Sequence, residues 1–145
     1  MDRMVRCHAM KVYLAVPIIA NRSLERARLI AETIAKCGLE VSSPWVLGPG
    51  EPREGSPINV FQRDKQGAEK CDILVADVTL PSIGVGMEIM AAYQSRRRII
   101  VVQKRGAITS NMLNQMDRKQ VVEFDDDASL VAGLESALLA AVGPR

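Results

Sequence analysis

The sequence predicts an α/β fold in which helices cover both faces of a parallel β-sheet. The first observation is the segment 71–78, which is almost wholly apolar and β-branched, as in a central strand covered on both faces. The second is that five short apolar segments alternate with segments of helical periodicity. The third is the lack of repeats and linkers, so residues 1–145 are expected to form a single domain, with 1–10 as a frayed start. These features favour a flavodoxin-like (Rossmann-like) three-layer sandwich with a five-stranded parallel sheet in the order 2-1-3-4-5.

The first half of the chain is expected to contain two strands and two helices. In order, the predicted elements are a strand at 11–16, an amphipathic helix at 23–37, a short strand at 39–42, a loop rich in Pro and Gly at 43–56, and a helix at 58–70. Gly38 ends the first helix, and Ser56 with Pro57 begins the second. The loop carries the only tryptophan, Trp45, which favours a partly packed segment over a disordered one.

The second half of the chain is organised around the stretch 72–89. Four turn-forming residues follow the third strand: Pro81, Ser82, Gly84 and Gly86. They predict a tight turn in which the two glycines are free to adopt positive φ angles. Helical periodicity then begins at Val85 and places Glu88 in the first turn of a helix. The remaining elements are a strand at 98–103, a loop at 104–109, a short helix from Ser110, a strand at 121–124, and a helix at 128–141 capped by Asp125–Asp127.

Composition narrows the classes of partner. The chain is 48% hydrophobic and 25% charged, with a net charge of +2, which is too small to indicate binding to a nucleic acid polymer or a membrane. The only basic cluster, Arg96–Arg98, falls at the expected end of a helix, where cations complement the helix dipole. No apolar run approaches the roughly 20 residues that a membrane span needs, and the N-terminus has no signal-peptide core. A cytoplasmic location is therefore expected.

Metal and cofactor chemistry is not expected either. The three cysteines (Cys7, Cys37 and Cys71) have unrelated spacings, and His8 is the single histidine. The first loop, Pro17–Asn21, has no dinucleotide-binding glycine pattern. The sequence thus predicts no metal site and no cofactor.

Two carboxylates and one tyrosine are the candidates for chemistry. Glu88 is expected at the carboxyl end of the third strand, and Tyr13 interrupts the aliphatic first strand. Asp64 has the helical spacing that places it on an apolar face with Phe61 and Ala68. In a 2-1-3-4-5 sheet the first and third strands are neighbours, so all three groups can reach the crevice at the carboxyl ends of these strands.

Two acids without a metal or a histidine suit cleavage of a glycosidic bond, with one acid ionised as nucleophile and the other protonated as general acid. The helix dipole is expected to keep Glu88 ionised, whereas an apolar face favours the protonated form of Asp64. Structural roles stay open: Tyr13 as a core aromatic, Asp64 neutralised by Arg63, and Glu88 as an ordinary helix acid. Ser82 and the amide groups of 84–87 form a candidate cradle for a phosphate or hydroxyl.

The segment 76–89 resembles the signature of the nucleoside 2-deoxyribosyltransferase superfamily. It is most similar to the branch of 2'-deoxynucleoside 5'-monophosphate N-glycosidases. The resemblance extends to the first strand with the two residues that follow it (11–18), to Arg63–Asp64 and to 109–112, and covers most of the chain, roughly 11 to 124. It implies hydrolysis of the N-glycosidic bond of deoxynucleoside monophosphates, without a cofactor.

The resemblance also implies roles for individual residues. Glu88 would be the nucleophile at C1' of the deoxyribose, Asp64 would protonate or hold the departing base, and Tyr13 would orient Glu88. The implied substrate-binding residues are Ser82, Gly84, Gly86, Ser110 and Met112. Ser82 would bind the 5' end of the substrate. Ser110 would reach the active site of a neighbouring subunit, so a homodimer is expected.

Two positions bear on the kind of substrate. Ser82 favours a 5'-phosphate, because the nucleoside transferases of the superfamily usually have an acid there, which would repel it. The first loop departs from the glycosidase pattern, a Gly-Ser-Ile-Arg type loop, because the corresponding residues are Val16–Ile19. Arg22 is a candidate substitute for the missing arginine. Two alternatives therefore stay open: base exchange on deoxynucleosides, and a nucleotide-binding sensor without turnover.

Overall fold

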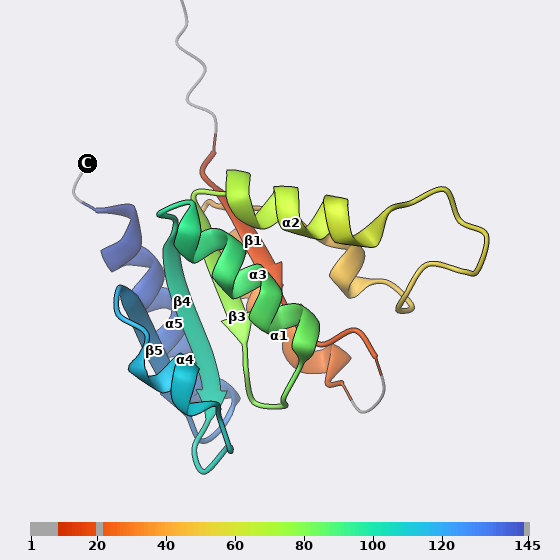
Figure 1. Ribbon diagram of the computed structural model, residues 1–145. Coiled ribbons are helices and arrows are strands. Elements are labelled where there is room, and N and C mark those ends of the chain that lie inside the picture. Colours follow the sequence, from red (N-terminus) through yellow and green to blue (C-terminus); the bar gives the residue numbers. More distant parts are fainter. Residues whose placement is uncertain (1–8, 20–21, 144–145) are drawn as a thin grey trace, which may run out of the picture.

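A computed structural model describes residues 9–19 and 22–143 (Figure 1). Its centre is a five-stranded, all-parallel sheet with the order β2-β1-β3-β4-β5. The strands are β1 (Lys11–Ala15), β2 (Glu40–Val41), β3 (Ile73–Asp77), β4 (Arg98–Lys104) and β5 (Lys119–Phe124). The fold class and the strand order predicted from the sequence are confirmed. The frayed start expected at 1–10 falls mostly outside the described residues.

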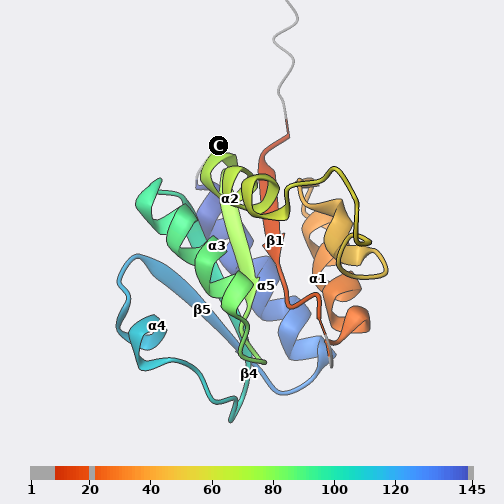
Figure 2. The same cartoon turned by 45° about the vertical axis from the view of Figure 1, so that its right-hand side comes forward.

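Helices cover both faces of this sheet. They are α1 (Leu24–Lys36), the 3-10 helix η1 (Pro44–Leu47), α2 (Val60–Lys70), α3 (Ile83–Gln94), α4 (Asn111–Gln115) and α5 (Asp127–Val142). The two views in Figures 1 and 2 show α1 and α5 on one face and α2 and α3 on the other. Among the described residues, none of these helices is both long and apolar enough to cross a membrane.

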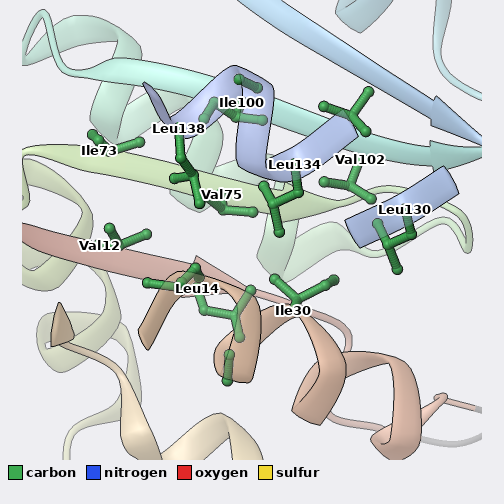
Figure 3. Close-up of a cluster of buried hydrophobic side chains, with 14 of the residues drawn as sticks. Val12, Leu14, Ile30, Ile73, Val75, Ile100, Val102, Leu130, Leu134 and Leu138 are labelled. Atoms are coloured by element: carbon green, nitrogen blue, oxygen red, sulfur yellow. The ribbon is translucent and has the colours of Figure 1, made fainter. Parts of the chain in front are cut away.

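Alternation along the strands divides the core into two layers. Val12 and Leu14 of β1 point toward α1 and α5, where they meet Ile30 and Leu134 in the larger cluster (Figure 3). The alternate residues of β1, Tyr13 and Ala15, point to the side covered by α2 and α3. All five residues of β3 are buried, as predicted for a central strand covered on both faces. Tyr13 therefore belongs to the layer that also contains α3.

The helix starts are fixed by side-chain caps. Ser23, Ser82 and Asp126 each accept a hydrogen bond from a backbone N–H in the first turn of α1, α3 and α5, respectively. Asn59 caps α2 in the same way, so this helix begins at Val60 and not at the predicted Ser56–Pro57. Within the predicted acidic run 125–127, Asp126 provides the cap of α5.

Two sequence-based expectations about local structure are wrong. Gly84 and Gly86 do not form a turn and have no positive φ angle, because Ser82 starts the helix immediately and both glycines lie inside α3. Phe61 is 58% exposed, so it does not share a buried face with Ala68. The reason is that α2 buries only Ala68 fully, where the helix passes over β1.

Candidate active site

Three polar groups meet between β1, α2 and α3, where the sheet order makes β1 and β3 neighbours. Tyr13 lies opposite Leu74 of β3 and points to the α2 and α3 face. Asp64 of α2 and Glu88 of α3 both lie close enough to the Tyr13 hydroxyl to disfavour its ionisation. The structure thus brings together the three residues that the sequence singled out for chemistry.

Tyr13 is fully buried, and the backbone of α2 passes directly over it. A side-chain carbon added at Gly67 would lie only 2.5 Å from Tyr13 Cε2, so this position has room for glycine alone. The edge of Trp45 in η1 lies against the same ring, with centroids 6.1 Å apart and planes at 62°. The Tyr13 hydroxyl is buried and has no hydrogen-bond partner of good geometry among the described residues. Burial and the two nearby carboxylates raise its pKa above the ordinary value, so it stays a neutral donor.

Glu88 is the acid whose environment departs most from the sequence-based expectation. It is the sixth residue of α3, beyond the first turn, where the effect of the helix dipole is small. Burial raises its pKa to about 8, and the nearby Asp64 adds to this, while the Tyr13 hydroxyl and Arg63 lower it. The expectation that the dipole keeps Glu88 ionised is therefore wrong for the ligand-free protein, because the loss of solvation outweighs the helix dipole.

Asp64 is only partly buried, and it is paired. Arg63 Nε donates to Asp64 Oδ1 at 2.8 Å, and the side chains are 21% and 17% exposed. The guanidinium of Arg63 also lies over the Trp45 ring, 4.5 Å from its centroid. The expectation of a purely apolar environment for Asp64 is thus wrong, and the neutralisation by Arg63 that had been left open is present.

The N-terminus of α3 lies next to the acids. A side-chain carbon at Gly84 would lie 3.9 Å from Glu88 Oε1 and 4.0 Å from Ser82 Oγ, which makes Gly84 a neighbour of both. Ser82 Oγ accepts from Val85 N at 3.3 Å, and the amide of Gly86 bonds to the carbonyl of Ser82. The amides of Val85 and Gly86 therefore already have partners within the helix start. Fewer of the amides at 84–87 are free to bind a phosphate or hydroxyl than the sequence predicted.

Ser110 and Met112 lie elsewhere, on the α4 side of α3. Together with Ser82 and Gly86 they line a pocket of about 430 Å³ that is mostly apolar. Tyr13, Asp64 and Glu88 do not line it. The predicted substrate-binding residues are thus divided between the acid cluster and this pocket, which we call the α3–α4 pocket, with Ser82 at their junction.

Three arginines near the carboxyl edge make contacts that hold the site together, and for Arg22 and Arg26 the sequence predicted no such contact. Arg26 Nε donates to the buried Asp77 at 2.6 Å, which ties α1 to the end of β3. Arg22 donates to the carbonyls of Val46, at 2.6 Å, and of Gly48, so it braces η1. Arg63 pairs with Asp64, as described above. The contact of Arg63 could be predicted from the sequence because Arg63 directly precedes the candidate acid Asp64. The contacts of Arg22 and Arg26 could not, because their partners are distant along the chain.

Comparisons with known proteins bear on this site. No protein-family model matches the chain. The chain is 34% identical over 104 residues to the Thermofilum pendens protein assigned as 2'-deoxynucleoside 5'-phosphate N-hydrolase 1, covering 70% of this chain and 73% of that protein. It is 32% identical over 88 residues to the 5-hydroxymethyl-dUMP N-hydrolase of Danio rerio, covering 59% and 61%. The solved structure of Clostridium botulinum CMP N-glycosidase BcmB matches with a TM-score of 0.65 at 17% identity, over 87% of this chain and 98% of that chain, which supports the fold.

The burial of Glu88 predicts an unusual dependence of stability on pH. Between the ordinary value of 4.5 and about 8 the folded protein keeps a proton that the unfolded chain releases, so the free energy of unfolding falls as pH rises through this window. Each pH unit within this window lowers the free energy of unfolding by up to about 1.4 kcal/mol. Glu88→Gln removes this penalty, so urea unfolding at pH 8.5 should show it to be more stable than wild type, with little difference near pH 4. The exposed Glu32→Gln serves as control, and equal pH slopes for wild type and Glu88→Gln would contradict the assignment.

Proposed function

Because the chain belongs to the nucleoside 2-deoxyribosyltransferase superfamily, in the branch of the 2'-deoxynucleoside 5'-phosphate N-hydrolases, we propose that it hydrolyses the N-glycosidic bond of 2'-deoxynucleoside 5'-monophosphates. The products are the free base and deoxyribose 5-phosphate. The single observation that carries the proposal is the convergence of Tyr13, Asp64 and Glu88 from three different elements. Two carboxyl groups are what retaining glycosidase chemistry needs, and a neutral hydroxyl donor beside them can orient one of the two.

The proposed reaction has two displacements at C1' of the sugar. In the first, a Glu88 oxygen forms a bond to C1' as the bond to the base breaks, and Asp64 delivers a proton to the leaving base. In the second, Asp64 takes a proton from water, whose oxygen attacks C1' and releases Glu88. A single proton on the acid pair is enough for this cycle, since its presence on Asp64 leaves Glu88 ionised. In this reaction the Tyr13 hydroxyl, which is free within the described part of the structure, turns to donate to Glu88 and holds its orientation.

Ser82 is the proposed contact for the 5' end of the substrate. Its Oγ already accepts from Val85 N, so its own proton is free to be donated to a phosphate oxygen. The amides of Ile83 and Gly84, at the start of α3, lie beside it and favour an anion. Gly84 has no side chain, so a ligand can approach both Ser82 and Glu88 over the helix backbone.

The first loop supports a second candidate function, base exchange on deoxynucleosides. Val16, Pro17, Ile18 and Ile19 offer no side-chain donor to a phosphate, and Ile19 is 67% exposed. The guanidinium of Arg22 is occupied by two carbonyls, so it does not replace the missing arginine in this structure. A substrate with a free 5'-hydroxyl would need fewer donors, and a second base would then replace water in the second displacement.

We also propose a homodimer formed through the α3–α4 pocket. Apolar side chains are strongly exposed around it: Ile83 is 87% exposed, Ile108 85% and Met112 72%. Ordinary surface residues of this kind occur singly, whereas these three line one pocket. A second copy of the chain covers them, and Ser110 at the same surface then contributes its hydroxyl to the partner's substrate site.

The proposed activity is tested by incubating the protein with a panel of deoxynucleoside monophosphates and deoxynucleosides and measuring released base and deoxyribose 5-phosphate. Glu88→Ala should reduce the rate by at least about 1000-fold, and Asp64→Asn by about 100-fold or more. Tyr13→Phe should lower kcat and leave KM nearly unchanged. Glu32→Ala is the matched control on an exposed helix face. Base exchange would appear as a new nucleoside when a second free base is added.

No released or exchanged base from any substrate would contradict an enzymatic function. A nucleotide-dependent rise in Tm without product would then identify a binding protein.

The homodimer is tested by mixing two impaired variants, Ser110→Ala and Glu88→Ala. In a mixed dimer one site regains both groups, so after subunit exchange the mixture should recover about a quarter of the wild-type activity. Light scattering should show a dimer, and Ile83→Asp should convert it to a monomer. In a control mixture of wild type with the double variant, in which both changes sit in one chain, no mixed dimer has a complete site, so subunit exchange should lower the activity from about half to about a quarter of the wild-type value. A mixture no more active than its two components would contradict the shared site.

A further inference from the structure

We propose that Arg63 is a positioning residue of this site: its guanidinium lies on the Trp45 ring, fixes the Asp64 carboxylate through an ion pair and brings a positive charge to the acid cluster. The inference deepens the proposed glycosidase function and rests on it for its catalytic meaning. Arg63 acts through its neighbours and is not assigned a contact with substrate.

Arg63 has two partners that together determine where its guanidinium lies. Its Nε donates to Asp64 Oδ1 at 2.8 Å, and its Cζ lies 4.5 Å from the centroid of the Trp45 ring. A guanidinium is planar, so stacking on an indole restricts its tilt while the ion pair restricts its direction. Asp64 follows Arg63 directly in α2 and is 17% exposed. The Asp64 carboxylate is therefore held by Arg63, whose guanidinium is in turn held on the Trp45 ring.

The charges around Glu88 give Arg63 a second role. The groups of the described chain that act on Glu88 come from two elements, β1 with Tyr13 and α2 with Asp64 and Arg63. Tyr13 is neutral, Asp64 opposes ionisation of Glu88, and Arg63 favours it. Within this group Arg63 is the cation, so it offsets part of the cost of placing two carboxyl groups in one buried site.

Trp45 is itself braced and connects the parts of the site. Arg22 donates to the carbonyls of Val46 and Gly48, on the residues just after Trp45 in η1 and its C-terminal end. One part of the indole contacts Tyr13 edge-on, and Arg63 lies over the ring. The same aromatic side chain thus supports both the tyrosine and the arginine. Loss of the indole is expected to loosen Arg63, whereas loss of Arg63 should leave Tyr13 in place.

The decisive test measures the ionisation of Glu88 without requiring activity. The side-chain carboxyl carbon of Glu88 is followed by ¹³C NMR as a function of pH in the ligand-free protein, and its signal is assigned by its absence in Glu88→Gln. Arg63→Met keeps the length of the side chain and removes the charge, so the midpoint should move up by about one pH unit. Arg63→Lys keeps the charge without the planar stacking and should show a smaller shift. Lys65→Met, on the same helix but paired with Glu69, is the matched control and should show none.

Activity adds a second readout that a purely structural role would not change. In Arg63→Met the falling limb of kcat/KM against pH should move up with the NMR midpoint, because loss of the last proton of the acid pair leaves none for the departing base. The kcat at its plateau should fall about tenfold or more because Asp64 is no longer fixed. Trp45→Leu should show the same changes to a smaller extent, and little further effect when combined with Arg63→Met. If Arg63→Met does not fold, the NMR midpoint of Glu88 is measured in Arg63→Lys and Trp45→Leu instead, and an upward shift there supports the inference.

An unchanged Glu88 midpoint in folded Arg63→Met would overturn the inference. If that variant does not fold, an unchanged midpoint in both Arg63→Lys and Trp45→Leu would do so. If wild type releases no base, the proposed function fails, and the NMR midpoint still shows whether Arg63 sets the ionisation of Glu88. If wild type is active and the midpoint does not move, the proposed function stands without this role for Arg63.

Discussion

The structure depends on one costly placement, the partly buried carboxyl group of Glu88 next to a second acid. Burial and Asp64 raise its pKa to about 8, so the ligand-free protein carries a proton there at neutral pH. Taking such a group from water opposes folding, and the two apolar layers of the sheet must offset this cost. The same placement makes the group reactive once it loses its proton, because a poorly solvated carboxylate beside a sugar carbon is a better nucleophile than one in water. Stability and the proposed chemistry are thus opposed at this residue.

The geometry of the site follows from how α2 is allowed to approach β1. Gly67 lets the helix backbone pass directly over the Tyr13 ring, at a distance where any side-chain carbon would clash. That approach brings Asp64 and Arg63, about one turn earlier in the helix, toward the Tyr13 hydroxyl and Glu88. Trp45 then closes the space beside Tyr13 from the η1 segment. A small backbone detail therefore determines whether the groups meet at all.

Much of the fold could be predicted because it depends on local patterns. The apolar segment of β3 and the alternation with helices were enough for the five-stranded order, and the resemblance of 76–89 to a known family pointed to Glu88 and, with Arg63–Asp64, to the second acid. The electrostatics could not be predicted, because the pKa of Glu88 depends on burial by elements far away in sequence. The turn expected at Gly84 failed because glycine permits a turn but the Ser82 cap starts a helix. The stacking of Arg63 on Trp45 joins positions 18 residues apart through a loop whose path the sequence does not specify.

The most direct test of the central claim is to trap the bond between Glu88 and the sugar. The protein is mixed with a deoxynucleoside monophosphate, quenched in acid within milliseconds, digested, and searched by mass spectrometry for a deoxyribose 5-phosphate adduct. We expect an adduct on the peptide that contains Glu88, formed as the base is released and absent in Glu88→Gln. Release of base in a burst without any such adduct, or an adduct on another residue, would contradict the claim.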